Sequence, residues 1–275
     1  KFSLASEMSV NLMKGYDMGL NYIIQGHMKR FFEKRETLFA VIWIIAYVVG
    51  MSAIQSAVEG GALAKGLLAG YGLALSAVFL VFAVKNGLCG YFGLCAPKLS
   101  AKKMLFYIPM IATASVNLWF GVQLNYTPLE SALNVVSMVF VGFLEEVIFR
   151  GLLFRAMCRT NVKAAFIVTS LTFGAGHIVN LVNNSGRSVA ETLAQIAYAC
   201  AIGFAFAAAA YFSGSIIPCI ITHITINSLS TFSAECADGA FLAATLAIMA
   251  INVGYGVWLT VRGVRRAKQG AHNLG

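Results

Sequence analysis

Residues 139–154 place three charged side chains inside an almost wholly apolar stretch, and this combination limits the possible folds more than any other feature. Glu145, Glu146 and Arg150 lie there among Val, Ile, Leu and Phe residues. On membrane-insertion scales each charge near a helix centre costs about 2.5–3.5 kcal/mol, whereas each large apolar residue returns only about 0.5 kcal/mol. A helix over this stretch therefore cannot face lipid on all sides, and other helices or water have to cover its charged side.

The composition favours an integral membrane protein. Of the 275 residues, 59% are hydrophobic and 11% are charged, whereas soluble domains carry about 25% charged residues. The net charge of +9 does not indicate a nucleic-acid partner, because the basic residues lie between apolar runs, as they do in cytoplasmic loops. The six cysteines form no CxxC pair, so neither a zinc ribbon nor a disulfide framework is supported.

Hydropathy predicts an all-α, polytopic membrane protein with about eight transmembrane helices. The predicted spans are Leu38–Ala57, Ala62–Val84, Met104–Leu124, Leu129–Phe154, Ala164–Leu181, Glu191–Phe212, Ile216–Leu229 and Phe241–Val261. Most of them reach the roughly 20 residues that a helix needs to cross a bilayer. Residues 1–36 precede them and have the periodicity of an amphipathic helix at the membrane surface. We therefore expect an amphipathic juxtamembrane segment over 1–36 and a single transmembrane helical domain over 37–275.

The distribution of basic residues predicts the orientation. If the N-terminus lies inside, the inside loops carry most of the Lys and Arg residues, and the outside loops carry Lys65 and Arg187. Such an asymmetry is typical of cytoplasmic loops. We therefore expect both termini in the cytoplasm, and from the compact chain we expect a bacterial cytoplasmic membrane.

Two of the predicted helices carry polar pairs at helical spacing. Glu146 and Arg150 are four residues apart, with the acid first, which is the favourable order for an ion pair on one helix face. His223 and Asn227 have the same spacing and project from one face. Glu145 is rotated by about 100° from its neighbour, and we expect it to point, unpaired, into a cavity.

A second histidine, His177, lies in another apolar segment, four residues after Phe173. From the helix rise, the glutamates and both histidines fall in the inner half of the bilayer or near its midplane, so they can meet. A glutamate beside a histidine can hold and deprotonate water, and a histidine with an asparagine amide can donate hydrogen bonds to an oxyanion. These are the parts that peptide hydrolysis by water needs.

Three motifs in chain order resemble those of the CPBP family, also called the Abi family, of intramembrane CAAX-processing and bacteriocin-processing proteases. They are Glu145-Glu146-Val-Ile-Phe-Arg150-Gly151, Phe173-x-x-x-His177 and His223-x-x-x-Asn227. Each motif falls within a predicted membrane helix. The resemblance covers about residues 129–229, and the first three helices are not distinctive.

The resemblance implies a glutamate-dependent intramembrane endopeptidase that uses no metal or other cofactor. By motif position, Glu145 is the expected general base and His177 is its partner in holding the water. His223 and Asn227 are expected to form the oxyanion hole.

The remaining motif positions are expected to support the site. Glu146 and Arg150 would orient it through their ion pair, and Phe173 would shape its wall. The expected partners are the lipid bilayer and a peptide or lipidated protein substrate, and the oligomeric state stays open to a homo-oligomer. The resemblance implies CAAX-type trimming, peptide maturation or bacteriocin-related processing, and nothing in the sequence selects among them.

Two alternatives remain open. Either glutamate together with His177 and His223 supplies ligands of a kind that suits catalytic zinc, although no carboxylate is evident in sequence as a second partner of either histidine. The same buried charges also suit a non-enzymatic protein, such as an ion or proton pathway, a bacteriocin-immunity protein or a scaffold. No inverted repeat with broken helices, which would favour a transporter, is evident.

Overall fold

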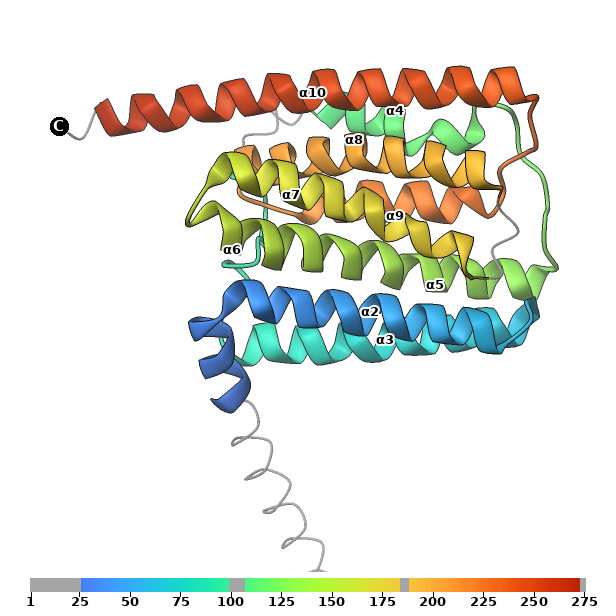
Figure 1. Ribbon diagram of the computed structural model, residues 1–275, viewed down its shortest axis with the longest axis horizontal. Coiled ribbons are helices and arrows are strands. Elements are labelled where there is room, and N and C mark those ends of the chain that lie inside the picture. Colours follow the sequence, from blue (N-terminus) through green and yellow to red (C-terminus); the bar gives the residue numbers. More distant parts are fainter. Residues whose placement is uncertain (1–25, 99–106, 184–187, 273–275) are drawn as a thin grey trace, which may run out of the picture.

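The regular structure of the chain is helical wherever the structure describes it. A computed structural model describes residues 26–98, 107–183 and 188–272, with side chains up to residue 262 (Figure 1). In chain order the elements are α2 (Glu36–Ala57), α3 (Gly61–Lys85), α4 (Ile108–Ala114), the short 3-10 helix η2 (Val116–Leu118), α5 (Pro128–Glu146), the π-helix η3 (Val147–Phe154), α6 (Arg155–Cys158), α7 (Val162–Ala175), the 3-10 helix η4 (Gly176–Leu181), α8 (Val189–Ser213), α9 (Ile217–Ser230) and α10 (Asp238–His272). Residues 26–34 form a further helical segment before α2.

Six helices among the described residues are long and apolar enough to cross a membrane. One of them is the continuous helix Pro128–Cys158, which joins α5, η3 and α6, while Ile217–Ser230 is a shorter apolar helix. The all-α membrane fold is thus confirmed, but the expected number of eight spanning helices is not. The predicted amphipathic helix over residues 1–36 lies mostly outside the described residues, and the division into 1–36 and 37–275 stays a prediction.

The predicted span Met104–Leu124 is wrong as one continuous helix over its described part. Here α4 covers only 7 residues and gives way to the 3-residue η2. The Asn117 side chain donates a 2.7 Å hydrogen bond to the carbonyl of Ile226, and Gly121 adopts a φ of 105°, which favours glycine. Polar contacts to the end of α9 thus replace helical hydrogen bonds beyond residue 118.

Local capping explains where two of the long helices begin. At α5, the Thr127 side chain accepts from the backbone of Glu130, whose carboxylate accepts from the backbone of Thr127. Ser188 and Glu191 make the same reciprocal pair at the start of α8. Such capping boxes satisfy backbone N–H groups that have no partner within the helix.

The helices lie roughly parallel, and the long α5–η3–α6 helix runs through the middle of the bundle (Figure 1). It packs against α3 on one side and α9 on another, while α8 lies between α7 and α10. The segment η3 contacts α2 and α7 and is buried at every position. The side chains of Glu146 and Arg150 are thereby covered by protein, as the sequence required.

One glycine determines how closely α9 approaches α5. A Cβ atom added to Gly142 would lie 2.9 Å from the backbone nitrogen of Ile224, so no larger residue fits without moving one helix. The helices therefore meet at backbone contact distance. This contact lies one turn before Glu146 and one residue after His223, and it brings the two side chains within reach of each other.

Candidate active site

The buried acid of the central helix forms the ion pair that its spacing predicts. Glu146 Oε1 lies 2.9 Å from Arg150 Nη1, and the two side chains are 0% and 1% exposed. The guanidinium carbon of Arg150 lies 4.1 Å from the ring centre of Phe173 and 5.5 Å from that of Phe206. Aromatic faces and the carboxylate together compensate a cation that is removed from water.

His223 lies between the two glutamates. Its Nδ1 is 2.8 Å from Glu146 Oε1 and its Nε2 is 3.5 Å from Glu145 Oε2. Its ring also meets the Phe173 ring edge to face, with centres 5.7 Å apart. The expectation that neither histidine has a carboxylate partner is therefore wrong for His223. A carboxylate oxygen accepts more than one hydrogen bond, so pairing with Arg150 leaves Glu146 able to accept another.

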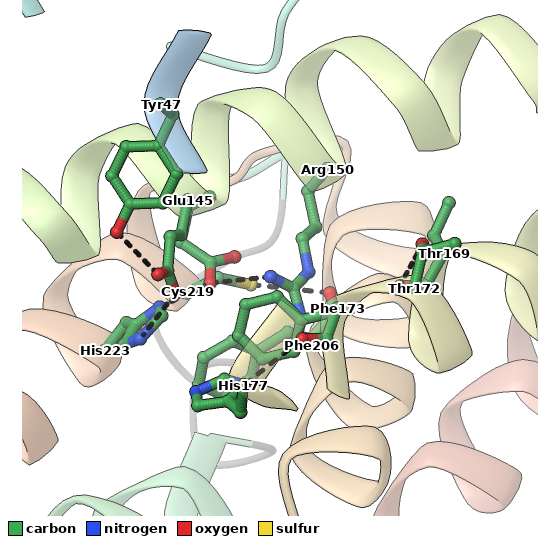
Figure 2. Close-up of polar contacts among 11 residues, drawn as sticks. Tyr47, Glu145, Arg150, Thr169, Thr172, Phe173, His177, Phe206, Cys219 and His223 are labelled. Carbon is green, nitrogen blue, oxygen red and sulfur yellow. Dashed lines mark hydrogen bonds and ion pairs between the residues drawn. The ribbon is translucent and has the colours of Figure 1, made fainter. Parts of the chain in front are cut away.

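The expectation that Glu145 is unpaired is wrong, because a tyrosine hydroxyl binds its carboxylate. The Tyr47 hydroxyl on α2 donates a 2.7 Å hydrogen bond to Glu145 Oε1, and Figure 2 shows this tyrosine reaching the carboxylate from a helix distant in sequence. The side chain of Glu145 keeps 14% of its surface exposed. Tyr47 was not predicted as part of the site. The sequence feature that could have indicated it is a tyrosine within an apolar helix, where a buried hydroxyl usually has a hydrogen-bond partner.

These contacts form one continuous polar chain across three helices. It runs from Arg150 through Glu146, His223 and Glu145 to Tyr47. With Nδ1–H donating to Glu146, Nε2 faces Glu145 Oε2 at 3.5 Å, which is long for a hydrogen bond but within the range of an ion pair. Hydrogen-bond donors and acids thus alternate along the chain, which suits a site inside a membrane-spanning bundle.

The remaining candidate residues lie beside this polar chain. His177 is at the start of η4, its Nδ1 is 3.2 Å from the carbonyl oxygen of Phe173, and its ring centre is 5.8 Å from that of Phe173. His177 and His223 therefore flank the same phenylalanine (Figure 2). Asn227 follows His223 by one turn of α9, and within the described part of the chain its side chain has no hydrogen bond. Among the described residues, no hydrogen bond or ion pair joins His177 or Asn227 to Glu145.

The candidate site lies next to irregular helix geometry on two sides. The π-helix η3 begins immediately after Glu146 and contains Arg150, and α7 changes to a 3-10 helix at the residue before His177. Single π turns and short 3-10 stretches inside helices occur frequently at functional sites. Hydropathy reports apolar length and not hydrogen-bond register, so neither feature was predicted.

The arrangement does not fit a zinc site of the expected kind. Catalytic zinc takes three protein ligands, but no three His, Cys, Asp or Glu side chains are grouped as metal ligands among the residues described. The His223 nitrogens already face the two glutamates, and His177 Nδ1 faces a backbone carbonyl. No catalytic step is therefore derived through a metal.

The fold and the site together define a helical membrane protein with a buried acid–histidine centre. Residues 127–229 match a family model, described as type II CAAX prenyl endopeptidase Rce1-like. This match confirms the resemblance to the CAAX protease family that the three motifs carry. Comparison with curated proteins and with solved structures gives no match.

Proposed function

We propose that the protein is an intramembrane endopeptidase in which Glu145 activates a water molecule to hydrolyse a peptide bond. The observation that carries the proposal is the environment of this carboxylate. It is partly exposed, it faces His223 Nε2 at 3.5 Å, and unlike Glu146 it makes no ion pair with any arginine among the described side chains. A carboxylate in such a position is able to accept a proton from water during the reaction.

The reaction needs one water and one proton carrier. Glu145 accepts a proton from the water, and the hydroxide attacks the carbonyl carbon of the scissile bond. The oxyanion formed accepts hydrogen bonds from His223 Nε2–H and from the Asn227 side-chain amide. Collapse of the tetrahedral intermediate breaks the C–N bond, and Glu145 returns the proton to the leaving amine. His177, beside the same Phe173 ring, helps to hold the water.

The pair of Glu146 and Arg150 acts through His223. In the imidazolium form of His223, Nδ1–H donates the 2.8 Å hydrogen bond to Glu146, and Nε2–H is left to donate to the oxyanion. The ion pair keeps the acceptor in place, and Phe173 limits rotation of the imidazole ring. Preorganised donors of this kind lower the barrier because they need no rearrangement when charge develops.

The depth of the site favours a membrane-associated or lipidated peptide substrate. The site residues lie on apolar helices of membrane-spanning character, so a substrate that partitions into the bilayer reaches them most readily. The name of the matching family adds prenylated peptides that end in a Cys-a-a-X sequence. A farnesylated Cys-a-a-X peptide is therefore the first probe, and bacteriocin-related peptides are the second.

The test uses the purified full-length protein in liposomes with a fluorogenic farnesylated Cys-a-a-X peptide. Wild type is compared with Glu145→Gln and with Glu59→Gln, which changes an exposed carboxylate in the α2–α3 turn. We expect wild type and Glu59→Gln to cleave the peptide and Glu145→Gln to lose at least about a hundredfold in rate. Mass spectrometry of membrane peptides that accumulate uncut in cells with Glu145→Gln identifies the natural substrate. Equal turnover and equal peptide profiles for wild type and Glu145→Gln would contradict the proposal.

The bundle is consistent with both termini on one side. Residues 26–34 and the C-terminal end of α10 lie at the same end of the described structure (Figure 1). We propose that this end faces the cytoplasm of a bacterial cell, because the loops there carry the excess of basic residues. Labelling of single cysteines placed in the α2–α3 turn and after residue 158 would test this orientation.

A further inference from the structure

A tyrosine outside the family-matched segment completes the acid–histidine centre. Tyr47 lies on α2, 98 residues before Glu145 in the chain, and its hydroxyl donates a 2.7 Å hydrogen bond to the carboxylate. The phenol is buried, at 7% exposure. This length is within the range of an O–H donor bound to an ionised oxygen, a type of hydrogen bond stronger than a neutral pair.

We propose that Tyr47 is a positioning residue for the hydrolysis: it keeps the Glu145 carboxylate in its proton-accepting orientation. The inference rests on the proposed function, because it assumes that Glu145 is the base. The two carboxylate oxygens have different partners: Oε1 accepts from the phenol, and Oε2 faces His223 Nε2 at 3.5 Å. This distance is long for a hydrogen bond, so Oε2 is left able to accept a proton from a water beside it.

The tyrosine is itself fixed by its surroundings. On α3, Tyr71 donates a 2.8 Å hydrogen bond to the carbonyl of Ala46, the residue before Tyr47. Tyr71 also covers Gly50, where an added Cβ would lie 2.1 Å from the phenol oxygen. These contacts hold α2 against α3 in one register. The hydroxyl that reaches Glu145 is therefore preorganised, as a positioning role requires.

Loss of the hydroxyl has a specific consequence. Without it, Oε1 loses its hydrogen-bond donor and the carboxylate is free to rotate toward His223. A shorter pair with the imidazole then occupies the oxygen that accepts the proton from water. Turnover should therefore fall more than substrate binding.

The test is Tyr47→Phe, which removes one oxygen and keeps the ring that packs between the helices. With the farnesylated peptide we expect kcat to fall about tenfold with KM nearly unchanged, which is the effect of about one hydrogen bond. The matched control is Tyr255→Phe, because that buried phenol on α10 has no hydrogen-bond partner within the described residues. The control should leave both kcat and KM as in wild type.

A second measurement does not depend on the substrate. Infrared spectroscopy of the purified protein follows the carboxylate stretching bands, and the component absent from Glu145→Gln belongs to Glu145. This band should shift in frequency in Tyr47→Phe, which lacks the hydrogen bond to Oε1, and should stay unchanged in Tyr255→Phe. An unchanged band together with an unchanged kcat in Tyr47→Phe would overturn the role of Tyr47. If Tyr47→Phe behaves like wild type while Glu145→Gln abolishes cleavage, only this inference is contradicted. If Glu145→Gln keeps full activity, the proposed function itself is contradicted.

Discussion

The two adjacent carboxylates of the central helix have opposite surroundings. Glu146 is fully buried and receives hydrogen bonds from Arg150 and His223, whereas Glu145 is partly exposed and held by a neutral phenol. A rotation of about 100° between neighbouring helix positions thus separates an acid that maintains the structure from an acid that is free to react. The comparison teaches that identical side chains in one motif take their roles from the helices that each of them faces.

The largest expected effect is on stability and comes from removing Arg150, the cation that pairs with Glu146. Arg150→Met leaves a buried carboxylate without its cation, and we expect a loss of about 3–5 kcal/mol in the free energy of unfolding. Thermal unfolding in detergent measures the change. The double variant Glu146→Gln with Arg150→Met should recover much of the loss, because no buried charge is left uncompensated. Equal stability of the single and double variants would argue against a buried ion pair.

The next effect is on catalysis, at the histidine between the acids. We expect His223→Ala to lower kcat by about 10²–10³, the usual cost of one oxyanion donor, with a smaller change in KM. Steady-state kinetics on folded protein separates the two parameters, and His27→Ala, at an exposed residue before α2, is the control. If KM rises as much as kcat falls, His223 binds substrate rather than stabilising the oxyanion.

A smaller effect is expected where α9 meets α5. Gly142→Ala places a Cβ about 2.9 Å from the Ile224 backbone, and the overpacking should cost about 1–3 kcal/mol of stability. It should also lower kcat, because His223 moves with α9. Gly70→Ala is the matched control, since an added Cβ there meets nothing within 4 Å and alanine favours the helix. If both variants behave alike, close approach of the two helices is not what aligns His223 with the glutamates.

The smallest expected effect is that of metal removal. Because the residues described do not group as three ligands, we expect a chelator such as phenanthroline to leave turnover unchanged, with no stoichiometric zinc in the purified protein. Elemental analysis and the peptide assay measure both quantities. Activity that is lost with the chelator and restored by added zinc would support the zinc alternative instead.

The sequence allows the fold class and much of the site to be predicted, because both follow from patterns within single helices. Apolar length predicts spans such as Leu38–Ala57, and spacing predicts the pair of Glu146 and Arg150. The span Met104–Leu124 was wrong because its polar residues, such as Asn117, bind the backbone of another helix. Hydropathy averages over such residues and does not detect a partner distant in sequence.

What remained hidden in the sequence depends on contacts between helices. The hydrogen bond from Tyr47 joins α2 to α5 across 98 residues, and no sequence pattern within either helix predicts it. The hydrogen bond between Glu146 and His223 was not predicted for a different reason. Arg150, four residues after Glu146, already accounted for a buried charge at that position. Both omissions concern which side chain a carboxylate meets in space, and that is determined by packing between helices.

The π-helix Val147–Phe154 has a further consequence for how this protein tolerates changes in length. Its hydrogen bonds run from i to i+5, so the segment accommodates more residues per turn than a regular α-helix. A single-residue deletion between 151 and 154 would shorten the chain where the helix holds an extra residue. A deletion at 143 or 144 would instead rotate Gly142 and the preceding turns by about 100° around the helix axis relative to Glu146. The fold should therefore tolerate a one-residue deletion inside the π-helix, whereas the same deletion one turn earlier should disrupt the packing of α5 against α9.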